Sequence, residues 1–218
     1  RMNARINVNF TPTDWLTFGT NFSGIITERG LASGTTGNTS YGNPFFFARA
    51  MGPIYPVYIV DPATGDYILD AGGQKQYDLG GGYYEYGINA RPAAANPGRQ
   101  IVAELDYNNN ITNTNNLSKR SFVEFKLAKG LKVATDYSID IQNYKDSEFE
   151  NEIVGDGAPS GRYNQTRYIR TVTNWVQRIN YETTFAESHN LEVLLGHETF
   201  DRRYTEMYGM KSQLIVQG

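Results

Sequence analysis

The stretch GLKVATDYSIDIQNY, residues 130–144, decides the fold, because its apolar and polar side chains alternate. Apart from Thr135, the odd positions from 131 to 141 are apolar: Leu131, Val133, Tyr137, Ile139 and Ile141. The even positions are polar apart from Ala134: Lys132, Asp136, Ser138 and Asp140. Because a strand alternates its faces with a period of two, the stretch predicts a β-strand with one apolar and one charged face. The apolar face must contact either a protein core or lipid.

The same alternation recurs along the chain and predicts six long strands in three hairpins. The hairpins occupy residues 1–26, 117–144 and 167–204. Their predicted turns are the short polar segments TPTD, AKG and AESHN. Residues 205–218 are expected to form a loop or the start of a further strand, with a possible seventh strand at SQLIVQG (residues 212–218).

Composition also favours an all-β protein. The 218 residues are 39% hydrophobic and 20% charged, with 22 Gly and 16 Tyr, so turn formers and aromatics outweigh helix formers. A net charge of −3 gives no reason to expect nucleic acid as a partner. Zero cysteines exclude disulfides and thiolate metal sites. Because the strand pattern starts at the first residues, with no signal peptide, the chain is expected to be a piece of a longer protein.

The connections alternate between short and long. Residues 27–116 and 145–166 link the hairpins and are rich in Gly, Asn, Pro and Tyr, whereas the turns inside hairpins are short. Within the first, residues 57–60 and 67–69 predict a small hairpin turning at DPATGD. Strict alternation places both long connections at one end of the sheet, as in outer-membrane barrels with short periplasmic turns and long extracellular loops.

Two architectures fit the alternation. In a soluble sandwich the apolar face is the core and the charged face is solvated. In a transmembrane barrel, whose strands need only about 9–11 residues to cross the bilayer, the apolar face contacts lipid. Loop asymmetry favours the barrel, and there Val133, Ile139, Val193 and Leu195 face lipid. The residues then expected to face the lumen are Lys132, Asp136, Asp140, Glu192 and Glu198.

Aromatic residues near the strand ends fit the interfacial girdle of a barrel, although sandwiches also carry such residues. They are Phe10, Trp15, Tyr144, Tyr168, Trp175 and Tyr181. A second group lies in the long connection and is a candidate binding surface, because aromatic rings stack on sugars and pack on peptide side chains. Its members are Phe45, Phe46, Phe47, Tyr55 and Tyr58. The alternative is that these rings form the small core of the connection itself.

No catalytic or metal-binding motif is present, so neither an enzyme nor a cofactor is expected. His189 lies in a turn, and His197 has no convergent partners in the sequence. The segment from Asp106 to Asn110 superficially suggests a calcium site, but an Asn-rich turn explains it better.

The run GNPFFFARAMGPIYPVYIVDPATGDYILDAGGQKQYDLG, residues 42–80, resembles the SusC/RagA-type TonB-dependent outer-membrane transporters. Its P-x-Y-P-V-Y and D-x-x-T-G-x-Y elements are similar to that family. So are R-x-N-x-x-F-x-P-x-x-W-L around Arg5 to Leu16 and NLEVLLGHE at Asn190 to Glu198. The similarity extends over nearly the whole chain in the same order.

The resemblance implies a 22-stranded barrel in the outer membrane, plugged by an N-terminal domain and driven by TonB. It also implies a SusD-like surface lipoprotein as a lid and an oligosaccharide or peptide as cargo, with the aromatic connection touching one of them. Neither the plug nor the TonB box lies in these residues, so the chain corresponds to a middle portion of the barrel. The alternative function is a soluble or secreted all-β module that binds glycan.

Overall fold

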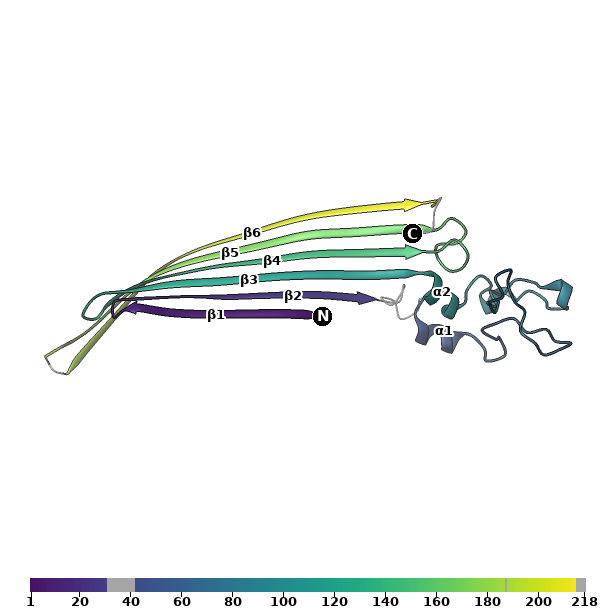
Figure 1. Ribbon diagram of the computed structural model, residues 1–218, viewed down its shortest axis with the longest axis horizontal. Coiled ribbons are helices and arrows are strands. Elements are labelled where there is room, and N and C mark those ends of the chain that lie inside the picture. The colour runs from purple at the N-terminus through teal and green to yellow at the C-terminus, as the bar shows by residue number, and fades with distance from the viewer. Residues whose placement is uncertain (31–41, 187, 215–218) are drawn as a thin grey trace. The chain divides into compact units, whose positions relative to one another are not determined.

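The computed structural model describes residues 1–30, 42–186 and 188–214 of the chain. Its dominant feature is one antiparallel sheet whose strands lie side by side in sequence order (Figure 1). The strands are β1 (Met2–Thr13), β2 (Leu16–Gly30), β3 (Asn109–Ala128), β4 (Leu131–Glu150), β5 (Arg162–Phe185) and β6 (His189–Ser212). The predicted all-β class is therefore confirmed. Within the described residues the sheet does not close, and β1 and β6 are its edges.

Several strands are longer than the sequence predicts. β6 runs to Ser212, past the expected end at residue 204, and the last four residues of the predicted seventh strand lie outside the described residues. β3 begins at Asn109, eight residues before the start of the predicted hairpin 117–144. Asn has low intrinsic strand propensity, but pairing with β4 overrides it, and Thr112 donates a side-chain hydrogen bond to Asp146 of β4.

The turns inside hairpins are tighter than expected. Residues 11–13 of the predicted turn TPTD continue β1. The pairing of β1 with β2 is irregular between Phe10 and Thr13, so Pro12 lies on an edge strand at a bulge, where a missing donor is tolerated. Between β3 and β4, Gly130 has a φ of 78°, and a Cβ there would collide with the carbonyl oxygen of Glu182. A side chain at residue 130 is thus disfavoured by the positive φ and also by the collision with Glu182.

Side-chain contacts show that the two faces of the sheet stay separate along the strands. Ser118 bonds Asp140, and six residues further along β4 Thr112 bonds Asp146, so β3 and β4 keep one register over this length. Equivalent pairs join β4 to β5 and β5 to β6: Asp136 with Arg178, Glu148 with Asn164, and Glu198 with Asn174. All these even-numbered residues therefore share one face.

The chain divides into two compact units. The sheet unit comprises residues 1–28, 113–145 and 166–207, and the loop unit comprises residues 29–112, 146–165 and 208–218. Every buried apolar side chain among the described residues belongs to the loop unit: Phe47, Met51, Ile59, Ile68, Ala95, Ile101, Ala103 and Val154. In the described part of the sheet unit, by contrast, no apolar side chain is buried. Those of the edge strands stay exposed, such as Ile6 at 58% and Leu195 at 63%, and Val133 and Ile139 of β4 are half-buried. Within the sheet unit itself, as far as it is described, no second layer packs on the apolar face of the strands.

The loop unit contains two short helices that the sequence reasoning missed, α1 (Pro44–Ala50) and α2 (Ile101–Tyr107). Asn43 caps α1, because its side-chain oxygen accepts from the backbone N–H groups of Phe45 and Phe46. Pro44 occupies the first turn, where its missing N–H costs nothing. An Asn-Pro pair of this kind is a readable helix start signal, so α1 could have been predicted.

The predicted small hairpin in the loop unit is confirmed. Val60 pairs with Tyr67 across the DPATGD turn, where Asp61 accepts from the backbone of Ala63 at 2.8 Å. A third segment extends the pairing, since Leu69 faces Lys75 and Tyr58 faces Tyr77 in antiparallel bridges. Two single-turn 3₁₀ helices, Tyr84–Tyr86 and Ala93–Ala95, complete the unit.

No helix in the described ranges is long and apolar enough to cross a membrane.

Candidate functional site

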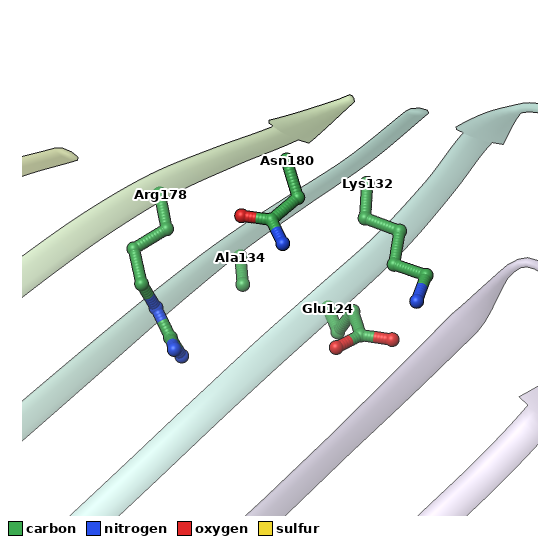
Figure 2. Close-up of a pocket in the computed structure, with 5 residues that line it drawn as sticks. All are labelled: Glu124, Lys132, Ala134, Arg178 and Asn180. Atoms are coloured by element: carbon green, nitrogen blue, oxygen red, sulfur yellow. The ribbon is translucent and has the colours of Figure 1, made fainter. Parts of the chain in front are cut away.

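The charged face of the sheet unit carries side chains from three neighbouring strands that project to the same side (Figure 2). Lys132 and Ala134 come from β4, Arg178 and Asn180 from β5, and Glu124 from β3. They surround a hollow of about 130 Å³. The small side chain of Ala134 leaves this space open between its longer neighbours, so the hollow is a property of the side-chain sizes on this face.

Two further hollows follow in the same row towards the long-connection end. The first, of about 310 Å³, is lined by Arg120, Asp136, Ser138, Asn174, Val176 and Arg178. The next, of about 320 Å³, is lined by Asn116, Leu117, Ser118, Asp140, Ile141, Gln142, Arg170 and Val172. Arg178 separates the first two hollows and pairs with Asp136 at 2.5 Å. The row has the mixed charge expected of a surface that stays in water.

The structure brings four of the five predicted lumen residues together on this face. Lys132 lines the first hollow, Asp136 pairs with Arg178, and Asp140 accepts from Ser118. Glu198 accepts from Asn174 of β5 at 2.8 Å. Glu192 lies six residues before Glu198 on the edge strand β6 and shares its parity. That this face borders a lumen stays a prediction.

The opposite face of the sheet is apolar, and aromatic residues collect on it near the short turns. Phe10 and Phe18 contact edge to face, with ring centroids 5.3 Å apart. Trp15 stacks on Phe125 at 6.3 Å, and the indole N–H of Trp175 donates to Thr135 at 2.8 Å. An indole combines a polar N–H with an apolar ring, which suits a membrane interface, and the other aromatic residues of this group are also typical of such an interface.

Tyr144 and Tyr168 do not belong to that aromatic group. Their rings stack at 4.6 Å, and Tyr168 in turn lies 5.4 Å from the ring of Tyr204 on β6. The register places all three on the charged face with Asp140 and Glu198. The prediction that Tyr144 and Tyr168 join a lipid-facing girdle was therefore wrong, because alternation, not nearness to a strand end, sets the direction of a strand side chain.

The predicted aromatic surface of the loop unit divides into two parts. Phe47 is 6% exposed and forms the core cluster with Met51 and Ile101, and Tyr55 packs against it. Phe47 is therefore a core residue, and its burial does not support the prediction that it contacts cargo or a lid. Phe46 is half-buried, whereas Phe45 is 88% exposed and is the member of the triplet that a partner can reach.

Tyr58 belongs to a separate cluster that sequence reasoning missed. Its ring stacks on Tyr77 at 5.0 Å and contacts Tyr67 edge to face at 6.0 Å. The ammonium group of Lys75 lies 3.9 Å from the centre of the Tyr67 ring. The hairpin pairing brings these rings together, and their spacing along the predicted hairpin was the signal that could have found them. Burial, with hydrogen bonds to Asp106 and Tyr58, raises the pKa of Tyr77 well above its ordinary value.

Ion pairs of the buried carboxylates Glu104 and Glu150 join the segments of the loop unit. Arg99 contacts Glu104 at 2.9 Å and also pairs with Asp156, and Arg162 pairs with Glu150. Burial raises the pKa of Glu104, and Arg99 only partly offsets this effect. Burial likewise raises the pKa of Glu150, against the opposing charge of Arg162. These pairs hold the unit together and form no open site.

The two histidines have local partners in the sheet unit. His197 Nδ1 lies 2.6 Å from the side-chain oxygen of Gln177, and the His189 ring lies 5.5 Å from Phe185. Among the described residues, no three His, Asp or Glu side chains gather closely enough to hold a metal ion.

Comparisons with known proteins give a likeness of fold only. No protein-family model matches the chain, and no curated protein matches it. Solved structures do match, among them the RagAB peptide transporter and the RagAB peptide importer in its closed-closed and open-open states. Their TM-scores are 0.68, 0.65 and 0.62, at 19%, 18% and 18% sequence identity. The matches cover 98–99% of this chain but only 22% of the matched chain, so this chain spans about a fifth of the length of the structures it resembles.

Proposed function

We propose that this chain is part of the barrel wall of an outer-membrane transporter of the SusC/RagA type. On this proposal the full protein imports an oligosaccharide or a peptide together with a SusD-like surface lipoprotein, is coupled to TonB through another part of the protein, and carries out no covalent chemistry. The sequence motifs and the fold likeness to RagAB point in the same direction.

The observation that carries the proposal is the uncovered apolar face of the sheet. Val193 and Leu195 of β6 are 40% and 63% exposed, and the large apolar side chains of β1 are exposed to a similar degree. Burying a side chain of this kind contributes about 1.5–3 kcal/mol, so a long sheet that leaves a whole row in water is not a stable soluble design. Lipid is the partner that removes this face from water while the charged face stays wet.

The soluble glycan-binding module is disfavoured by the same observation. A sandwich needs a second sheet packed on the apolar face of the first. The part of the chain that could supply one, the loop unit, buries its own apolar residues in its own core, around Phe47, Met51 and Ile101. The described chain has no second layer for a sandwich.

Deletion of the full-length gene in its source bacterium tests the proposal. The deletion strain should lose growth on a set of oligosaccharides or of oligopeptides supplied as the sole nutrient, and grow normally on the free monosaccharides and amino acids. Complementation restores growth, and membrane fractionation should place the protein in the outer membrane. Normal growth on every polymer tested, or recovery of the protein in the soluble fraction, would contradict the proposal.

A further inference from the structure

The tyrosine row of the charged face, defined as Tyr144, Tyr168 and Tyr204, has no role in the proposal above. It crosses three adjacent strands, with successive ring centroids 4.6 Å and 5.4 Å apart. Tyr204 is 49% exposed, and its hydroxyl donates to Glu206 at 2.7 Å. Because the Tyr144 and Tyr168 rings stack at 12° and Tyr204 is tilted by 34° against Tyr168, the row presents ring edges to a neighbouring ligand.

The third hollow of the charged face adjoins this row. Gln142 precedes Tyr144 by two residues on β4, and Arg170 follows Tyr168 by two on β5, so both share the face of the tyrosines. That spacing corresponds to about 7 Å along a strand. The hollow, of about 320 Å³, is at the small end of the range for ligand sites. A ligand in the hollow would therefore touch the tyrosine row.

The polar groups around the hollow are available and balanced in charge. Among the described residues, Gln142 and Arg170 form no side-chain hydrogen bond or ion pair, while Asp140 accepts only from Ser118. Arg170 and Asp140 carry opposite charges, so the hollow offers donors and acceptors without a net charge. That combination suits a neutral ligand that carries many hydroxyl groups.

The position along the strand places the row beyond the apolar band. On the opposite face of β4 the apolar positions run from Leu131 to Ile141, and polar Asn143 and Lys145 follow. Ten residues of a tilted strand cover about 25 Å, the height of the apolar band of a barrel. The tyrosine row therefore lies on the long-connection side of the band, in water.

We propose that Tyr144, Tyr168 and Tyr204, with Asp140, Gln142 and Arg170, form a subsite for a neutral sugar unit of an oligosaccharide. The proposal rests on the proposed transport function and adds the class of cargo and its place of contact. A peptide is the less suitable occupant, because extended peptides bind to sheet edges through backbone hydrogen bonds, and this site is on a sheet face.

Direct binding to the purified full-length protein in detergent tests the subsite. The probes are neutral oligosaccharides of five to seven units from starch, fructan, mannan and xylan, together with a pool of random octapeptides. Titration calorimetry should detect at least one oligosaccharide. Tyr168→Leu and Gln142→Leu should each weaken that binding by about tenfold, the size of one or two lost contacts.

Arg167→Ala is the matched control, because Arg167 is exposed, adjoins Tyr168 in sequence and lies on the opposite face of β5. It should leave affinity unchanged, and heat-modifiable migration in gels should show that all variants form barrels. No oligosaccharide binding, binding that both leucine variants retain, or peptide binding that depends on Tyr168 and Gln142 would each overturn the subsite.

This outcome is separable from that of the growth experiment. A deletion strain that fails only on peptides would leave the transport role standing and remove the sugar subsite. Tyr168-dependent sugar binding by a protein whose deletion leaves growth intact would support the subsite and remove the import role.

Discussion

Phe45 and Phe47 are two residues apart in α1, and burial gives them different roles. Phe47 packs on Met51 and Ile101, whereas Phe45 is exposed. We expect Phe47→Ala to cost the loop unit about 3–5 kcal/mol, the usual penalty for emptying a buried Phe site, and Phe45→Ala to cost almost nothing. Hydrogen exchange of the α2 amides in the full-length protein measures the difference. Equal exchange in both variants would contradict the core assigned to the loop unit.

The difference in burial between Phe45 and Phe47 also allows a test of whether the aromatic residues of the loop unit bind a partner. If the loop unit binds cargo or lid through exposed rings, Phe45→Ala alone should reduce uptake without reducing the amount of protein in the membrane. Phe47→Ala should reduce uptake only in proportion to lost protein. Measuring both quantities for each variant separates recognition from folding, and normal uptake by Phe45→Ala would remove this ring from the mechanism.

Glu104 gives the loop unit a pH dependence whose sign can be worked out. Burial raises the pKa of its carboxyl above the unfolded value of about 4.3, so the folded state binds the proton more tightly. Its contribution to stability is therefore present at low pH and is lost as the pH rises through the folded pKa. Glu150 acts in the same direction.

We expect the α2 amides to be better protected at pH 5 than at pH 7, after correction for intrinsic exchange rates. Glu104→Gln should flatten this dependence, because the amide does not titrate, with a remainder from Glu150. Asp66→Asn, at an exposed turn of the same unit, is the control and should leave the dependence intact. Protection that rises with pH in the unmodified protein would contradict the assignment.

At the scale of the strand, Val133 and Ala134 are neighbours in β4 with opposite directions. Val133 lies on the apolar face, and Ala134 lines the first hollow of the charged face. An Arg at the bilayer midplane on the lipid face of a barrel costs about 2–4 kcal/mol, whereas one in a wet interior costs little. Val133→Arg should therefore impair barrel assembly, measured by heat-modifiable migration, and Ala134→Arg should be tolerated. Equal yields of folded protein would count against membrane embedding.

The strands and their faces could be predicted from the sequence because a period of two is a local signal. The alternation from Leu131 to Ile141 needs no knowledge of neighbouring strands. The start of β3 at Asn109 could not be predicted in this way, because residues 109–116 are polar on both parities apart from Ile111 and form a strand through pairing with β4. The hollows could not be predicted either, since they depend on which side chains of three strands meet.

Part of the candidate site could also be predicted from the alternation of side chains along the strands. Lys132, Asp136, Asp140 and Glu198 follow from parity, and the structure places them on one face. Tyr144 and Tyr168 were assigned to the girdle because nearness to a strand end was given more weight than parity. The burial of Phe47 could not be predicted, because a run of three Phe residues does not reveal which ring of a short helix points inward.

At the scale of the whole molecule, single thiols placed in this chain, which has no cysteine of its own, test the topology. Ala63→Cys places a thiol in the exposed DPATGD turn of the loop unit, and Lys129→Cys places one in the short turn between β3 and β4. In intact cells a membrane-impermeant maleimide should label Cys at 63 but not at 129, if long connections face outward. In permeabilised cells both thiols should be labelled. Labelling at position 129 but not at position 63 in intact cells would mean that the short turns, not the long connections, face outward.

The two open edges of the sheet determine how the isolated chain would behave. β1 and β6 expose unpaired backbone N–H and C=O groups over 12 and 24 residues. Pro12 blocks only one position of the first edge, and an uncovered edge is a template for another copy. Expressed without its flanking strands, the chain should polymerise head to tail into ribbons that have no fixed size. In the proposed barrel, closure of the sheet into a ring would leave no free edge, so the neighbouring strands of the full-length protein would prevent this polymerisation.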